Sequence, residues 1–114
     1  MRAINNLVEA WYTPDSEKDA EVPTRFRIKP LNGEQYMTVM METRTNENGD
    51  LSLSASGMRQ AINYGLVGWE NFTDGTKDVL FSKASVSLIP APELIALASE
   101  IINRSSISEE QEKN

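Results

Sequence analysis

The pattern of side chains in two segments near the start of the chain predicts strands. In residues 6–13, Leu7, Glu9 and Trp11 face one way, with Val8, Ala10 and Tyr12 opposite. In residues 24–30, Phe26 and Ile28 occupy one side of the alternation. The other side is cationic and carries Arg25, Arg27 and Lys29. A period of two is typical of a strand with one buried face. We therefore expect two strands that form an antiparallel pair, joined by an exposed acidic connection over 14–23.

After Pro30 the spacing of apolar residues becomes helical. Asn32 suits the N-cap of a helix, and Gln35 stands where the partner of a capping box belongs. The stripe of this first predicted helix consists of Tyr36, Met37, Met40 and Met41. We expect the helix to end near Thr43 and a loop of turn-forming residues to follow over 45–50.

A second helix is predicted from an N-cap at Ser52 or Ser54 to Gly65. Its apolar positions on one face are Met58, Ala61 and Ile62. Gly65 suits the left-handed position that follows the end of many helices.

The last third of the chain alternates apolar runs with turn formers. Runs at 66–69 and 79–81 lie on either side of an Asp74-Gly75 turn, and Ser82 can cap a short helix that ends at Leu88. Pro92 suits the first position of the final helix, predicted over Glu93–Arg104. Its apolar stripe consists of Leu94, Leu97, Ala98 and Ile101, with Ile95 and Ile102 beside it.

These elements predict an α+β fold, in which a small antiparallel β-hairpin or sheet packs against three to four helices. At 114 residues the chain is long enough for one hydrophobic core and short for two domains. We assign residues 1–106 to a single domain. The polar residues 107–114 are expected to form a disordered tail.

The absence of cysteine and histidine excludes whole classes of chemistry. The usual zinc, copper and iron sites need these ligands, and Ser-His-Asp or Cys-His catalysis needs the imidazole. The close carboxylate pairs Asp15/Asp19 and Asp74/Asp78 stand among turn residues, without the apolar setting of catalytic carboxylates. We expect a protein that is not an enzyme and binds no cofactor or metal.

The charge balance narrows the choice of partner. The formal net charge is −6, from 17 acidic and 11 basic side chains, which opposes binding to a phosphate backbone. We interpret the cationic side of 24–30 as a solvated face, or as one that pairs with Glu17, Asp19 and Glu21. No apolar run approaches the roughly 20 residues that span a bilayer, and no secretory signal pattern is present. We expect a cytoplasmic protein without nucleic acid or membrane partners.

Protein binding is the remaining class of function. The methionines of the first helix suit a surface that adapts to varied partners, because the thioether side chain is flexible. The final helix has an apolar arc wider than a small core needs. Candidate binding residues are Met37, Met40, Met41, Trp69, Phe72, Leu94, Leu97 and Ile101. Core packing is the alternative for each group, and for Trp69 in particular.

Three elements in this order resemble a known family. They are residues 25–33 (Arg-Phe-Arg-Ile-Lys-Pro-Leu-Asn-Gly), residues 66–72 (Leu-Val-Gly-Trp-Glu-Asn-Phe) with the Asp74-Gly75 turn, and Phe81-Ser82 followed by a short and then a final amphipathic helix. Together they are similar to tail assembly chaperones of long-tailed, non-contractile (siphovirus-type) bacteriophages. The resemblance covers roughly residues 5–105.

The resemblance implies a chaperone in the cytoplasm of the host cell. Such a protein binds and solubilises the tape measure protein before the tail tube polymerises, and it contacts the tail tube protein or further copies of itself. Many weak contacts would then act collectively. The alternative is a structural tail or head–tail joining protein retained in the virion, which proteomics of purified particles would reveal. An acidic inhibitor or DNA mimic would need clustered acids, and here they are scattered.

The family also implies a longer product made by ribosomal frameshifting. Glu112-Lys113-Asn114 can be encoded as GAA-AAA-AAC, which contains the slippery string A-AAA-AAC. The nucleotide sequence of the gene tests this hypothesis.

Overall fold

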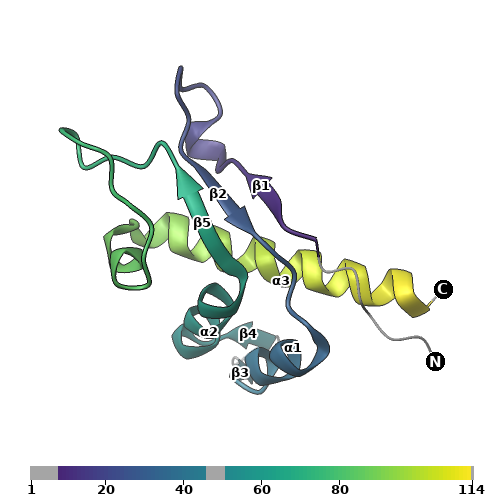
Figure 1. The fold of residues 1–114 in the computed structure, drawn as a ribbon. Coiled ribbons are helices and arrows are strands. Elements are labelled where there is room, and N and C mark those ends of the chain that lie inside the picture. The colour runs from purple at the N-terminus through teal and green to yellow at the C-terminus, as the bar shows by residue number, and fades with distance from the viewer. Residues whose placement is uncertain (1–7, 46–50, 114) are drawn as a thin grey trace.

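The computed structural model describes residues 8–45 and 51–113 of the chain (Figure 1). Within these ranges, the elements follow in the order β1 (Ala10–Tyr12), the 3₁₀ turn η1 (Asp15–Glu17), β2 (Arg25–Ile28), α1 (Gly33–Met40), β3 (Thr43–Thr45), β4 (Leu51–Leu53), α2 (Ala55–Gly65), β5 (Leu66–Glu70), the 3₁₀ turn η2 (Ala84–Leu88) and α3 (Ala91–Lys113). The predicted α+β class is confirmed: an antiparallel sheet packs with helices in one compact domain.

The main sheet has the strand order β1-β2-β5, with both pairs antiparallel. The predicted pairing of the first two strands is confirmed, with Ala10 opposite Ile28 and Tyr12 opposite Phe26. Phe26 and Ile28 are buried, as their period of two predicts. Figure 1 shows α3 crossing behind this sheet, with α1, α2 and the β3–β4 pair at one end of it. The sheet therefore has one face on α3 and one face toward solvent.

On the solvent face of the sheet, two arginines lie beside the Trp11 ring, and each forms an ion pair with a glutamate. The guanidinium carbons of Arg25 and Arg27 lie 5.0 and 5.7 Å from the ring centroid of Trp11. Arg25 pairs with Glu70, its register partner on β5, and Arg27 pairs with Glu9 at 2.7 Å. The predicted solvated face is confirmed, whereas the alternative pairing of Arg25 and Arg27 with Glu17, Asp19 and Glu21 is not observed, because cross-strand neighbours lie closer.

Helix starts follow the predicted caps. The Asn32 side chain accepts from the Gln35 backbone N–H at 2.8 Å, and the Gln35 side chain accepts from the Asn32 N–H at 3.0 Å. The Ser54 hydroxyl accepts from the Gly57 N–H at 3.1 Å, which fixes Ser54 as the cap of α2. These bonds satisfy amides that a helix start leaves without partners.

Helix boundaries elsewhere differ from the sequence-based expectation. The first helix ends at Met40, and the short strands β3 and β4 pair on either side of the expected loop, whose residues 46–50 lie outside the described ranges. The final helix begins at Ala91, so Pro92 is its second residue. It runs to Lys113, where a disordered tail was expected, because residues 109–113 are good helix formers.

The core forms where α3, α2 and the inner face of the sheet meet. Its buried apolar residues are Phe26, Ile28, Leu31, Val39, Ala61, Ile62, Leu66, Ile89, Leu97, Ala98 and Ile101. Leu97, Ala98 and Ile101 are fully buried, so the middle of α3 is the centre of the domain.

Gly65 lies at a close approach between α2 and α3. It is the last residue of α2, and a Cβ atom there would lie 2.6 Å from Cγ2 of Ile101. The expected left-handed position after the helix was wrong: Gly65 is helical, and Leu66 after it is extended. The reason for glycine is close approach, since only a hydrogen fits against the buried Ile101.

Ser105 joins α3 to the segment that leads into α1. Its buried hydroxyl donates to the Ile101 carbonyl at 2.7 Å and accepts from the Leu31 N–H at 2.7 Å. The second bond satisfies a backbone amide that would otherwise be buried without a partner.

The Asp74-Gly75 turn is present as predicted. The Asp74 carboxylate accepts from the backbone N–H groups of Thr76 at 2.9 Å and Lys77 at 3.0 Å, and Gly75 has a φ of 100°. These bonds, the one from Thr76 first, hold the pKa of Asp74 below its ordinary value of 3.8, because they favour the charged form.

We expect Gly65→Ala to lower the free energy of unfolding by about 1–3 kcal/mol, because the added methyl group has no room beside Ile101. Urea unfolding monitored by circular dichroism measures this change. Gly33→Ala is the matched control, since no atom lies within 4 Å of a Cβ at that position. A Gly65→Ala variant as stable as the wild type would contradict the role of the contact.

Removing the Ser105 hydroxyl should cost about 1–3 kcal/mol of stability, because Ser105→Ala leaves the Leu31 N–H buried without an acceptor. Amide hydrogen exchange at Leu31 should accelerate with it. Thr38→Ala removes a hydroxyl that likewise bonds a carbonyl one turn back, Glu34 O at 3.0 Å, but supports no buried amide. This control should change stability by no more than about 0.5 kcal/mol.

Candidate protein-binding groove

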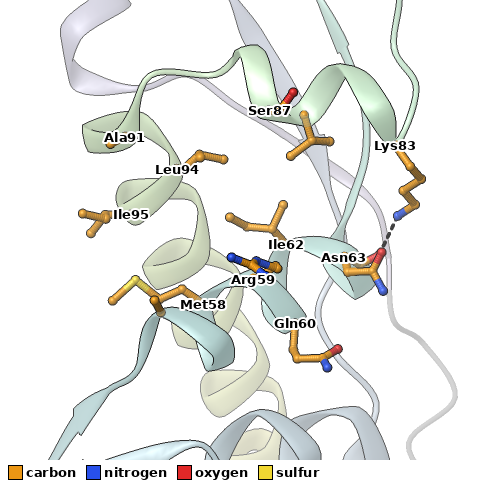
Figure 2. Close-up of a pocket in the computed structure, with 12 residues that line it drawn as sticks. Met58, Arg59, Gln60, Ile62, Asn63, Lys83, Ser87, Ala91, Leu94 and Ile95 are labelled. Carbon is orange, nitrogen blue, oxygen red and sulfur yellow. Dashed lines mark hydrogen bonds between the residues drawn. The ribbon is translucent and has the colours of Figure 1, made fainter.

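An open groove lies between α2, η2 and the first turns of α3 (Figure 2). Its volume is about 760 Å³. The lining residues are Ala55, Met58, Arg59, Gln60, Ile62, Asn63, Lys83, Val86, Ser87, Ala91, Leu94 and Ile95. We call this feature the α2–α3 groove.

The walls of the α2–α3 groove are helical faces. Met58 and Ile62 stand four positions apart on α2, and Ala91, Leu94 and Ile95 are spaced by three and four on α3. Side chains at these spacings line one side of a helix. Two such faces leave between them a trough of the shape that a third helix fills.

Apolar side chains in the groove are open to solvent. Ile95 has 51% of its surface exposed, and Met58, Val86 and Leu94 are half-buried. Ile62 closes the floor at 6% exposure. Figure 2 shows Met58 and Ile95 at one end of the groove. The groove thus presents both a fixed floor and a flexible methionine wall.

The charged residues of the groove lining are both cationic. Arg59 is exposed on α2, and Nζ of Lys83 donates to the Asn63 carbonyl at 2.6 Å, as Figure 2 shows. Two carboxylates in the described part of α3 bond outside the groove lining: Glu93 accepts from Ser16 at 2.7 Å and Glu100 pairs with Arg104 at 2.7 Å. The groove is therefore positive on a protein whose net charge is −6.

The methionines predicted to bind protein lie on α1, outside the groove lining. Met37 and Met41 are exposed by 66% and 81%, and Met40 is half-buried. The buried position of α1 is Val39, which the predicted stripe omitted. Tyr36 of the predicted stripe packs against the core beside Val39, whereas Met37 and Met41 reach solvent.

Trp69 and Phe72 belong to an aromatic cluster. The Trp69 ring meets Phe72 at 5.0 Å and Phe81 at 4.9 Å between centroids, both nearly edge-on, and Phe26 at 6.3 Å. The indole N–H donates to the Val79 carbonyl at 2.7 Å. Aromatic pairs in this geometry stabilise a fold beyond their buried area. Their packing role accounts for the positions of both residues.

The candidates on the final helix divide between groove and core. Leu94 lines the groove, whereas Leu97 and Ile101 are fully buried. Burial removes these two from any surface, so their nomination as binding residues is corrected to a core role. Ile95, noted only as widening the apolar arc, is a large exposed apolar residue of α3 in the groove.

Several groove residues were not among the predicted binding residues. They are Met58, Arg59, Lys83 and Val86. The apolar face of the second predicted helix includes Met58, but a spacing pattern does not reveal that part of this face is left open. No sequence signal marks the two cations as neighbours, because they lie in separate elements.

Neither a metal site nor a membrane-spanning helix is found in the described part of the chain. In the ranges 8–45 and 51–113, no group of three or more acidic side chains is placed to hold a metal ion. In the same described ranges, no helix has the length and apolar character needed to cross a membrane.

Comparison of the chain with protein-family models, with curated protein sequences and with solved structures finds no match.

Leu97→Asp and Ile95→Asp should behave differently although the two positions are close on α3. The first places a charge in the fully buried centre of the core and should unfold the domain. The second places it on the exposed groove wall, and stability should change by about 0.5 kcal/mol or less. Thermal unfolding followed by circular dichroism measures both. A folded Leu97→Asp protein would contradict the position of the core.

Proposed function

We propose that this protein binds a helical segment of another protein in the α2–α3 groove, and that it acts in this way as a tail assembly chaperone for a tape measure protein. The observation that carries the proposal is the groove itself, whose walls are two helical faces with exposed Ile95 and half-buried Met58 and Leu94. An amphipathic helix lays its apolar side chains into a trough of this form.

The size of the apolar wall suits reversible binding. A few partly exposed side chains bury a small area, and each contributes on the order of 1–2 kcal/mol when covered. A chaperone that must later leave its client needs contacts of this strength. Many copies bound along one long client would still cover it, because their effects add along the chain.

The acidic exterior supports the same proposal. A tape measure protein is long and helical, so its apolar stripes would associate with one another before the tail tube encloses them. Each bound copy of a protein with net charge −6 adds negative charge to the complex. Repulsion between such negatively charged complexes opposes their association. The similarity of the three sequence elements to tail assembly chaperones supplies the identity of the client.

Co-expression with the tape measure protein encoded in the same genome tests the proposal. The wild-type chain should keep the tape measure protein in the soluble fraction and copurify with it. Ile95→Asp should weaken this binding by about tenfold or more, because it places a charge on the apolar wall.

Leu80→Asp is the matched control. Leu80 is 82% exposed and lies outside the groove lining, so this variant should bind as the wild type does. Equal binding by wild type and a folded Ile95→Asp variant would reject the groove as the binding site. A tape measure protein that stays insoluble with the wild-type chain would reject the chaperone role.

A further inference from the structure

We infer that the segment bound in the α2–α3 groove is an acidic amphipathic helix, whose carboxylates lie beside its apolar stripe about one helical turn apart. The inference rests on the proposed function, because it requires that the groove binds a helix. It adds the sign and the spacing of the charged residues on the bound helix, which the apolar walls alone do not determine.

The sign of the charge follows from the groove lining. Among the described lining residues, Arg59 and Lys83 are the charged ones, and none of these residues is a carboxylate. In the part of the chain whose side chains the structure describes, the ion pairs of α3 and of the sheet do not involve Arg59. An exposed guanidinium beside an apolar wall is well placed for a carboxylate of a bound segment. A basic segment would instead meet two like charges.

The spacing follows from the contact between Lys83 and α2. Nζ of Lys83 donates to the carbonyl of Asn63, and Asn63 stands four positions after Arg59 on the same helix. Residues four apart on a helix are separated by about one turn along its axis, roughly 6 Å. Lys83 Nζ therefore lies about one helical turn further along α2 than the backbone of Arg59. A partner helix lying along α2 meets the two cations with carboxylates at positions i and i+3 or i+4.

The placement of the protein's own acids agrees with this assignment. Glu93 and Glu100 lie on α3 and bond to Ser16 and Arg104, and the ion pairs of the described residues include none between these two acids and Arg59 or Lys83. The two cations would also make the groove selective for acidic segments. Two exposed ion pairs add little affinity, whereas like charges on a wrong partner oppose its entry.

Three synthetic helical peptides of about 15 residues test the inference. All carry the same leucine stripe at i, i+3, i+4 and i+7. The positions beside the stripe hold glutamate, glutamine or lysine, one turn apart. Binding to the full-length protein is measured by fluorescence anisotropy at low and high salt. We expect the glutamate peptide to bind about two- to fivefold more tightly than the glutamine peptide, and the lysine peptide to bind most weakly. High salt should reduce these differences.

Arg59→Glu should reverse the preference between the glutamate and lysine peptides. Lys77→Glu makes the same charge change on the exposed Asp74-Gly75 turn, outside the groove lining, and should leave the order unchanged. Circular dichroism of both variants establishes that they are folded. Reversal by Arg59→Glu alone is the result expected.

The outcomes separate the two proposals. Equal binding of all three peptides, lost in Ile95→Asp, would keep the groove as a helix-binding site and overturn the acidic partner. Failure of every peptide to bind would remove the basis of both proposals. Self-association of the wild-type chain that Ile95→Asp and Arg59→Glu both abolish would show that a second copy occupies the groove, and would overturn the inferred partner.

Discussion

The fold depends on one close approach, at the point where α2 ends against the middle of α3. Gly65 lies there with room for no side chain beside Ile101. The same residue's carbonyl accepts from the Lys29 N–H at 2.9 Å, and β5 begins at the next residue. One position thus fixes two helices and two strands relative to one another. A larger residue there would displace all four elements, because a packed interior has little free volume.

The same approach sets the width of the α2–α3 groove. Toward the start of each helix the walls carry Met58 and Ile95, and no further element covers them in the described residues. The core thus holds the two walls at a fixed separation while leaving their outer parts uncovered. Because the walls are already held in place, this surface loses little conformational entropy when it binds a partner.

Features that depend on neighbouring residues could be predicted from the sequence. The capping box of Asn32 and Gln35, the Ser54 cap and the alternation of Phe26 and Ile28 all involve residues close in the chain. Features that depend on distant contacts could not. Thr43–Thr45 and Leu51–Leu53 are too short to show a period, and they become strands only by pairing with each other.

The candidate site was predicted only in part for the same reason. Helical spacing identified Leu94 and the widened arc at Ile95, but it assigned Leu97 and Ile101 to the same surface. The spacing of apolar residues shows which side of a helix is apolar. The helices and strands packed against that side determine which part of it is buried. Arg59 and Lys83 become neighbours only through the meeting of α2 with the segment before η2.

The two tryptophans of the chain lie on opposite faces of the sheet, and this gives each face its own optical signal. Trp69 is held among phenylalanine rings, with its indole N–H bonded to a carbonyl. Trp11 is 40% exposed beneath two guanidinium groups. We expect Trp69 to emit at shorter wavelength than Trp11. Dissolved quenchers can reach the exposed Trp11 side chain. The intrinsic fluorescence of the unlabelled protein therefore reports separately on its interior and on its charged outer face.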